Sequence, residues 1–135
     1  MGTHYATCSW SSTSGYQALT PNGEIKMFGE DGHRAVELML LSAAACLDFY
    51  LTEYVRERKL PVSQLHVTCE GEITPHPERV SVIKTTVKID GELTEKEASK
   101  MVTMCERTCK VMNTFKHQPQ VHVAIEQLSK EPLHQ

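Results

Sequence analysis

The chain has 135 residues, a formal net charge of −3 and a pI near 6.1, and 40% of its residues are hydrophobic. This length suits one domain with a real core, and without a basic block the charge gives no electrostatic basis for binding nucleic acid. We expect no signal peptide, and the apolar run between Glu37 and Asp48 is too short to span a bilayer, so no membrane association is predicted.

The first thirty residues have the composition of short strands separated by turns. Thr3–Trp10 is strand-like, Ser11–Gly15 is a turn cluster, and Tyr16–Thr20 resumes the strand pattern. Pro21-Asn22-Gly23 is typical of a tight turn between extended segments. We therefore predict a hairpin that continues through residues 25–28.

A long helix is predicted from about Arg34 to Arg58. Between Leu38 and Leu47 only Ser42 is polar, so apolar side chains point in nearly every direction around the helix. A helix that is apolar all round must be buried all round, and the sheet of a domain this small covers one side. We expect a second subunit to cover the other side, where Ala43-Ala44-Ala45 would let the backbones approach closely.

Two long strands follow the helix. Apolar and polar residues alternate from Leu65 to Ile73, which is typical of a half-buried strand, and Cys69 belongs to the inward set. Val80–Ile89 has a similar pattern and is expected to pair back after a turn at Thr74–Pro77. The two segments therefore predict a hairpin.

Thr94 and Glu97 have the spacing of a capping box, which predicts the start of a second helix. Apolar residues recur there at helical spacing: Ala98, Met101, Val102, Cys105, Cys109 and Met112. The sequence leaves open whether the helix breaks near Cys109. Gln120–Glu126 is predicted to be a last short strand, and the polar tail from Ser129 to Gln135 is expected to be loose.

The order of these elements indicates the fold class. Short strands, a long helix, two long strands, a helix and a short strand make an α+β domain over residues 1–135. We predict an antiparallel sheet with the helices gathered on one side.

The cysteines are the candidate functional residues. The chain has five, Cys8, Cys46, Cys69, Cys105 and Cys109, an odd number at irregular spacing that favours a reducing cytoplasm over a disulfide-stapled secreted fold. Cys46 follows three alanines inside the apolar helix, and Cys109 lies late in the second helix. Two such thiols suggest redox chemistry at a protected site, although buried cysteines also serve as small core hydrophobes.

Cys105 and Cys109 are four residues apart and share a helix face. Cys105 could compete with Cys109 for a partner thiol, or the pair could bind a metal with His117 or His122. Nothing in the sequence fixes either histidine nearby, no CxxC pair exists, and no glycine-rich phosphate loop occurs. We therefore predict neither a metal nor a cofactor.

The chain resembles the OsmC and organic hydroperoxide resistance (Ohr) family, as a divergent OsmC-like branch. The resemblance runs from about Thr3 to Gln127, and its specific parts are Glu37, Ala44-Ala45-Cys46 and the second cysteine, Cys109. It implies an OsmC-like fold that forms an intertwined homodimer, with two long helices at the centre and a sheet on each side.

The resemblance also implies a thiol-dependent peroxidase. Cys46 would attack the O–O bond of an organic hydroperoxide, and the resulting sulfenic acid would condense with Cys109 to form a disulfide. An external dithiol would then reduce that disulfide. The alternative from another functional class is a non-catalytic dimer of this fold, which binds an apolar ligand or responds to redox state.

Three features depart from the family pattern. Typical members hold the thiolate with an arginine from the N-terminal strands, whereas the first arginine here is Arg34, at the helix start. Glu37 fits the position of the family carboxylate, but nine helical residues place it about 13 Å from Cys46 along the axis and on the opposite face. It would act across the dimer or through an intermediary, or it is an N-terminal carboxylate that the helix dipole favours. Cys109 precedes Lys110-Val111-Met112 instead of the usual Pro-Val-Ser.

Overall fold

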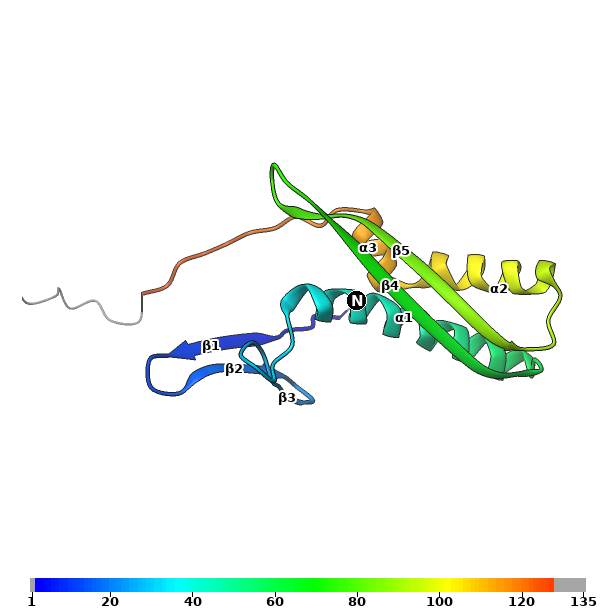
Figure 1. Cartoon of the computed structure of the whole chain (residues 1–135), viewed down its shortest axis with the longest axis horizontal. Helices are drawn as coiled ribbons and strands as arrows, with labels where there is room; N and C mark the ends of the chain where they lie inside the picture. Colours follow the sequence, from blue (N-terminus) through cyan, green and yellow to red (C-terminus); the bar gives the residue numbers. More distant parts are fainter. Residues whose placement is uncertain (1, 128–135) are drawn as a thin grey trace, which may run out of the picture.

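The computed structural model describes residues 2–127, which form an α+β fold with two antiparallel sheets and a long central helix (Figure 1). The sequence predicted one antiparallel sheet, whereas the structure has a three-stranded sheet and a separate two-stranded sheet. The elements are β1 (Thr7–Ser11), β2 (Gly15–Thr20), β3 (Gly23–Ile25), α1 (Ala35–Arg58), β4 (Val62–Thr74), β5 (Arg79–Gly91), α2 (Glu95–Thr108) and α3 (Lys110–Lys116).

The N-terminal sheet, β1–β2–β3, lies apart from the rest of the subunit beyond the start of α1 (Figure 1). Its side chains Trp10 and Tyr16 are 64% and 54% exposed. A tight loop connects the sheet to α1, in which the Phe28 N–H donates to the His33 carbonyl at 3.0 Å. Gly32 is required there, because a Cβ would lie 1.8 Å from the carbonyl oxygen of Phe28. A three-stranded sheet is stable by itself only with a buried apolar face, and the residues of β1 are all exposed here.

Helix α1 buries one side and exposes the other. Ala43, Leu47 and Leu51 are buried in the subunit core, whereas Leu41 and Phe49 on another face are 58% and 60% exposed. Within residues 2–127, α1 is the one helix long and apolar enough to cross a membrane, but it forms the packing centre of the subunit. The expected all-round burial is therefore incomplete in a single subunit.

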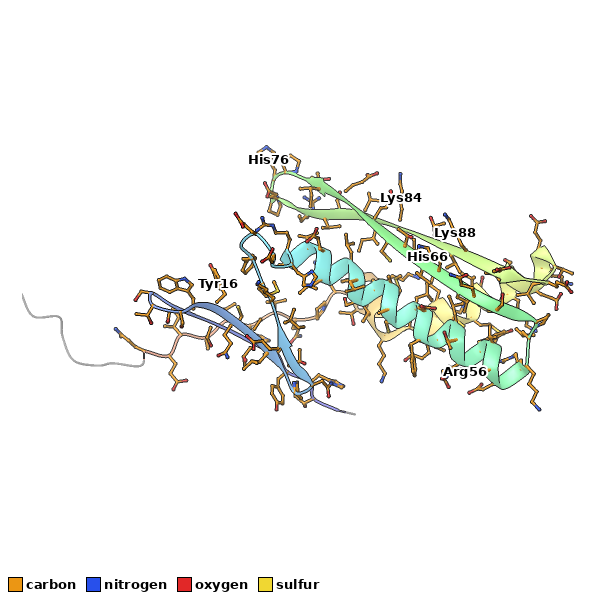
Figure 2. All side chains as sticks on the ribbon, turned by 60° about the horizontal axis from the view of Figure 1, so that its bottom comes forward. Tyr16, Arg56, His66, His76, Lys84 and Lys88 are labelled. Atoms are coloured by element: carbon orange, nitrogen blue, oxygen red, sulfur yellow. The ribbon has the colours of Figure 1, made fainter. Side chains whose placement is uncertain are left out.

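The β4–β5 hairpin crosses α1 diagonally (Figure 1). Its inward residues pack on the helix, and Gly71 lies so close that a Cβ would be 3.3 Å from the Leu40 methyl groups. Cys69 pairs with Thr85 across the hairpin and packs against the core, which confirms its predicted placement. His66 and Lys88 also pair across the strands, and their side chains project away from α1 (Figure 2).

The second helical region is two helices separated at one residue. The capping box that begins α2 is confirmed, because the Glu97 N–H donates to Thr94 Oγ1 and the Thr94 N–H donates to Glu97 Oε1. The hydrogen bond from the Thr94 backbone N–H, and to a smaller extent the Thr94 hydroxyl, lowers the pKa of the Glu97 carboxyl. At Cys109 the backbone is extended, with ψ of 114°, so α2 ends and α3 begins. The break that the sequence left open therefore falls on the candidate cysteine.

The predicted last strand at Gln120–Glu126 is wrong for the isolated subunit. This segment has no strand structure, and Val121, Val123 and Ile125 are 80%, 87% and 96% exposed. It extends away from α1 and the hairpin (Figure 1). Its alternation is typical of a strand, but strand structure also requires a neighbour for the backbone N–H and C=O groups. The tail expected to be loose, Ser129–Gln135, lies outside the described residues.

Candidate redox site

The break between α2 and α3 places Cys109 in the core beside α1, where Cys46 packs against the same cluster of residues. Cys109 is fully buried and Cys46 is half-buried. The Cys109 N–H still donates to the Cys105 carbonyl at 3.0 Å, and its own carbonyl accepts from Asn113 at 2.9 Å. Both helices therefore fix the backbone of Cys109, and its thiol faces α1.

The environment keeps the Cys109 thiol protonated. Burial is the largest influence and raises the pKa of Cys109, since a thiolate is poorly solvated in the core. The hydrogen bond with Cys46 and the negative charge of an ionised Cys46 raise it further, while the backbone N–H groups of Met112 and Val111 lower it. The net direction is upward, so the Cys109 thiol ionises less readily than a solvent-exposed cysteine.

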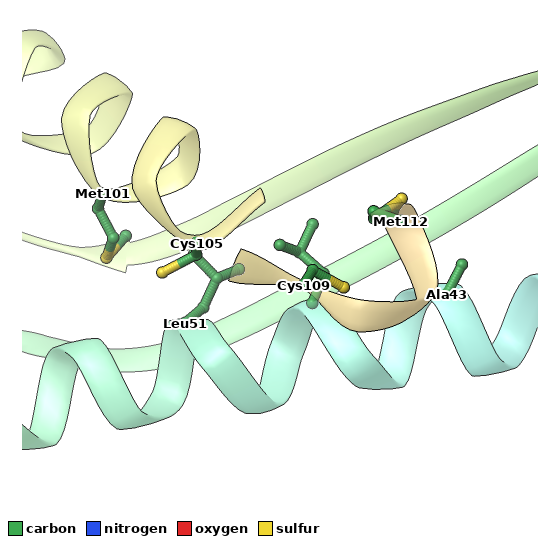
Figure 3. Packing of buried hydrophobic residues seen from close by; sticks show 7 residues of the cluster. Ala43, Leu51, Met101, Cys105, Cys109 and Met112 are labelled. Carbon is green, nitrogen blue, oxygen red and sulfur yellow. The ribbon is translucent and has the colours of Figure 1, made fainter. Parts of the chain in front are cut away.

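Cys105 does not share this site. In Figure 3 its sulfur points along the core toward Met101, whereas the Cys109 sulfur points toward Met112. The Cys105 thiol donates to the Tyr50 carbonyl at 3.5 Å. Burial raises the pKa of Cys105, and the charge of Arg58 lowers it to a smaller extent. Cys105 is therefore a buried core residue whose sulfur points away from Cys109.

The family model for OsmC-like proteins matches residues 28–124, which include all of α1, the hairpin, α2 and α3. The chain belongs to the OsmC-like protein family. The resemblance identified from the sequence is thereby confirmed, whereas the search of curated proteins gives no match.

Solved structures agree with this family at the level of the fold. A hypothetical protein from Aquifex aeolicus VF5 is 22% identical with a TM-score of 0.74, over 87% of this chain and 90% of that one. An OsmC-like protein from Mycoplasma pneumoniae is 16% identical, with a TM-score of 0.69 and coverage of 87% and 89%. An organic hydroperoxide resistance protein OsmC from Legionella pneumophila is 19% identical, with a TM-score of 0.63 and coverage of 87% and 91%.

In this OsmC-like subunit, Arg34 and Glu37 lie at the start of α1 and not beside the thiols. The backbone N–H of Arg34 donates to Glu37 Oε1 at 2.9 Å, so Glu37 acts as a helix cap. Nine helical residues separate Glu37 from Cys46, a rise of about 13 Å. Lys26, the other cation near this end, forms an ion pair with Asp31 at 3.2 Å. One subunit therefore supplies the two thiols without bringing Arg34 or Glu37 to them.

Asp48 is a residue that the sequence analysis did not select. Its Oδ1 atom is buried and has no hydrogen-bond partner within residues 2–127. Such an oxygen is costly unless it meets a donor. An acid at the end of the apolar run, two residues after Cys46, was the available signal in the sequence. In the same part of the chain, no group of three His, Cys, Asp or Glu residues is arranged to hold a metal ion.

We expect the two buried thiols to make the free energy of unfolding depend on pH in the alkaline range. The pKa values of Cys105 and Cys109 are raised in the folded state, so the unfolded chain loses these protons first, near its ordinary value of about 8.5. The unfolded state then binds fewer protons, and the free energy of unfolding falls as pH rises above that value. Urea titrations of reduced protein from pH 7 to 10 measure this fall. The Cys105→Ala/Cys109→Ala double variant should show a shallower fall, and an equal slope would contradict the assignment.

Proposed function

We propose that this protein is a thiol-dependent peroxidase that reduces organic hydroperoxides at Cys46 and Cys109. The observation that carries the proposal is that half-buried Cys46 and fully buried Cys109 belong to the same core packing between α1 and the α2–α3 break. The Legionella pneumophila structure described as an organic hydroperoxide resistance protein supports the same reaction class.

The chemistry assigns a different step to each cysteine. The Cys46 thiolate attacks one oxygen of ROOH, the O–O bond breaks, and Cys46 becomes a sulfenic acid while RO⁻ takes a proton to give ROH. The Cys109 sulfur then attacks the Cys46 sulfur, which forms the disulfide and releases water. An external dithiol reduces the disulfide and is itself oxidised. We assign the nucleophile to Cys46 because it is the more accessible of the two thiols, whereas Cys109 is fully buried.

A cation is still required to stabilise the Cys46 thiolate. We propose that Arg34 supplies it across a homodimer, with Glu37 in a supporting role, because the axial distance within one subunit is too long. The apolar core around the thiols suits an alkyl hydroperoxide. A reducing cytoplasm fits the five free cysteines.

A time course of intact mass tests the reaction. One equivalent of an alkyl hydroperoxide added to reduced protein should remove two hydrogens, because the second cysteine condenses with the sulfenic acid. Cys109→Ser should instead gain one oxygen, since the sulfenic acid then has no resolving thiol. If the mass of the wild-type protein does not change over minutes, the peroxidase proposal fails, and the non-catalytic dimer is favoured.

We also propose that the functional unit is a homodimer joined through the exposed face of α1. Leu41 and Phe49 are unusually exposed for large apolar residues, and the N-terminal sheet and residues 120–126 lack packing partners within the described subunit. Phe49→Glu should therefore shift the protein from dimer to monomer by sedimentation velocity. Met104→Glu, at a 39% exposed site on α2, is the matched control and should leave the dimer intact. A wild-type monomer at micromolar concentration would contradict the proposal.

A further inference from the structure

A separate cavity of about 320 Å³ lies between β5 and the two short helices, with α1 below it. Leu47 lies in its lining on the α1 side, while Ile83 and Val87 line it from β5. Val102 on α2, together with Met112 and Phe115 on α3, makes up the rest of the apolar lining, and Thr85 on β5 adds a hydroxyl group. Four elements thus line a cavity that is partly open to solvent.

The cavity has one charged end. Glu106 on α2 and Lys116 on α3 line it and form an ion pair with each other, and their side chains are 43% and 50% exposed. A carboxylate ligand would be attracted by Lys116 but repelled by Glu106, and an ammonium ligand would meet the reverse, so neither ion gains a net attraction from the pair. A hydroxyl group avoids both penalties, because it donates to the carboxylate and accepts from the ammonium.

The volume sets the size of the ligand. An apolar cavity of about 150 Å³ in another protein binds benzene, and this one is roughly twice as large. We propose that the cavity binds an uncharged amphiphile, an alkyl chain with a single hydroxyl head. The chain lies against Val102 and Val87, and the head reaches the ion pair.

This site is distinct from the thiol pair. Neither Cys46 nor Cys109 lines the cavity, although Leu47 and Met112 do. Binding there requires no oxidation of either thiol, so it is independent of the proposed peroxidase reaction. Inactive protein could still bind the alcohol, and an active peroxidase could fail to do so.

The first test is a titration of reduced, full-length protein with 1-octanol, followed by ¹H–¹⁵N NMR. Saturable shifts are expected at the amides of Val87 and Phe115. Val102→Trp fills the cavity and should weaken binding at least tenfold, whereas Met104→Trp, an exposed position on α2, should not. Absence of binding, shifts confined to other residues, or unchanged affinity in a folded Val102→Trp protein would overturn the proposal.

The second test varies the charge of the ligand head group, so its outcome does not require the Val102→Trp protein to fold. Octanoate and octylammonium should each bind the wild-type protein at least tenfold more weakly than 1-octanol. Lys116→Met should improve binding of octylammonium, and Glu106→Gln should improve binding of octanoate, each by about tenfold or more. Equal affinities for the three ligands, or no response to either variant, would show that the ion pair does not receive the head group.

Discussion

Cys46→Ser is expected to lower the rate of hydroperoxide reduction by on the order of 10³-fold or more, to the level without protein. A serine hydroxyl at this half-buried position ionises far less readily than a thiol, and the buried Cys109 is protonated, so neither residue replaces the lost nucleophile. The measurement is peroxide consumption with excess dithiol, for reduced protein of matched concentration.

Two other cysteine variants make this result specific. Cys109→Ser should still react once with peroxide, and its turnover should then depend on direct reduction of the sulfenic acid by the added dithiol. Cys105→Ser should retain turnover within about twofold, because its thiol contacts the Tyr50 carbonyl instead of Cys46. Equal activity in Cys46→Ser and wild-type protein would remove Cys46 from the mechanism.

Leu51→Ala is expected to lower the free energy of unfolding by about 2–5 kcal/mol. Leu51 is fully buried, and it belongs to the cluster that includes Met101 and Cys105 between α1 and α2. Truncation removes apolar contacts and leaves a cavity that these helices cannot readily close. Urea denaturation at a fixed protein concentration measures the loss.

Leu51→Met is the matched control for that experiment. This substitution keeps the side-chain volume approximately constant and should lower the free energy of unfolding by less than about 1.5 kcal/mol. A loss below 1 kcal/mol for Leu51→Ala would mean that the site collapses around the smaller side chain or contributes little to the core.

Local sequence signals predicted most of the elements. Helix α1 begins and ends within a residue of the expected positions, because Glu37 caps its start and Pro61 follows its end. The Thr94 capping box correctly predicted the start of α2, and the alternation around Cys69 correctly predicted which face of β4 packs inward. In each case the determining interaction lies within a few residues of chain, so periodicity and capping chemistry suffice.

Features that depend on distant partners could not be predicted in the same way. The alternation in residues 120–126 is strand-like, but pairing requires a neighbouring strand that the subunit does not place there. The division into two sheets depends on where the loop at Gly32 directs the chain. The break at Cys109 has no proline or glycine to mark it, and it depends on the packing of α3 against α1, which is distant in the sequence.

The candidate site was predictable in its residues and not in its geometry. Two cysteines in apolar helices were evident, but the choice between Cys105 and Cys109 required their side-chain directions (Figure 3). The positions of Arg34 and Glu37 relative to the thiols follow from helical rise alone, and the structure adds that Glu37 accepts the Arg34 backbone N–H.

The β4–β5 hairpin affects how much newly synthesised protein reaches the native state without aggregating. Each strand is 13 residues long, and within residues 2–127 they form a two-stranded sheet, so each strand has an outer edge of unpaired N–H and C=O groups. Such edges recruit other strands and favour aggregation, which charged residues such as Lys84 and Lys88 oppose only in part. The yield of native protein should therefore depend on how quickly another strand or surface covers these edges. If this step is slow, chains that have already folded correctly would be lost to aggregation.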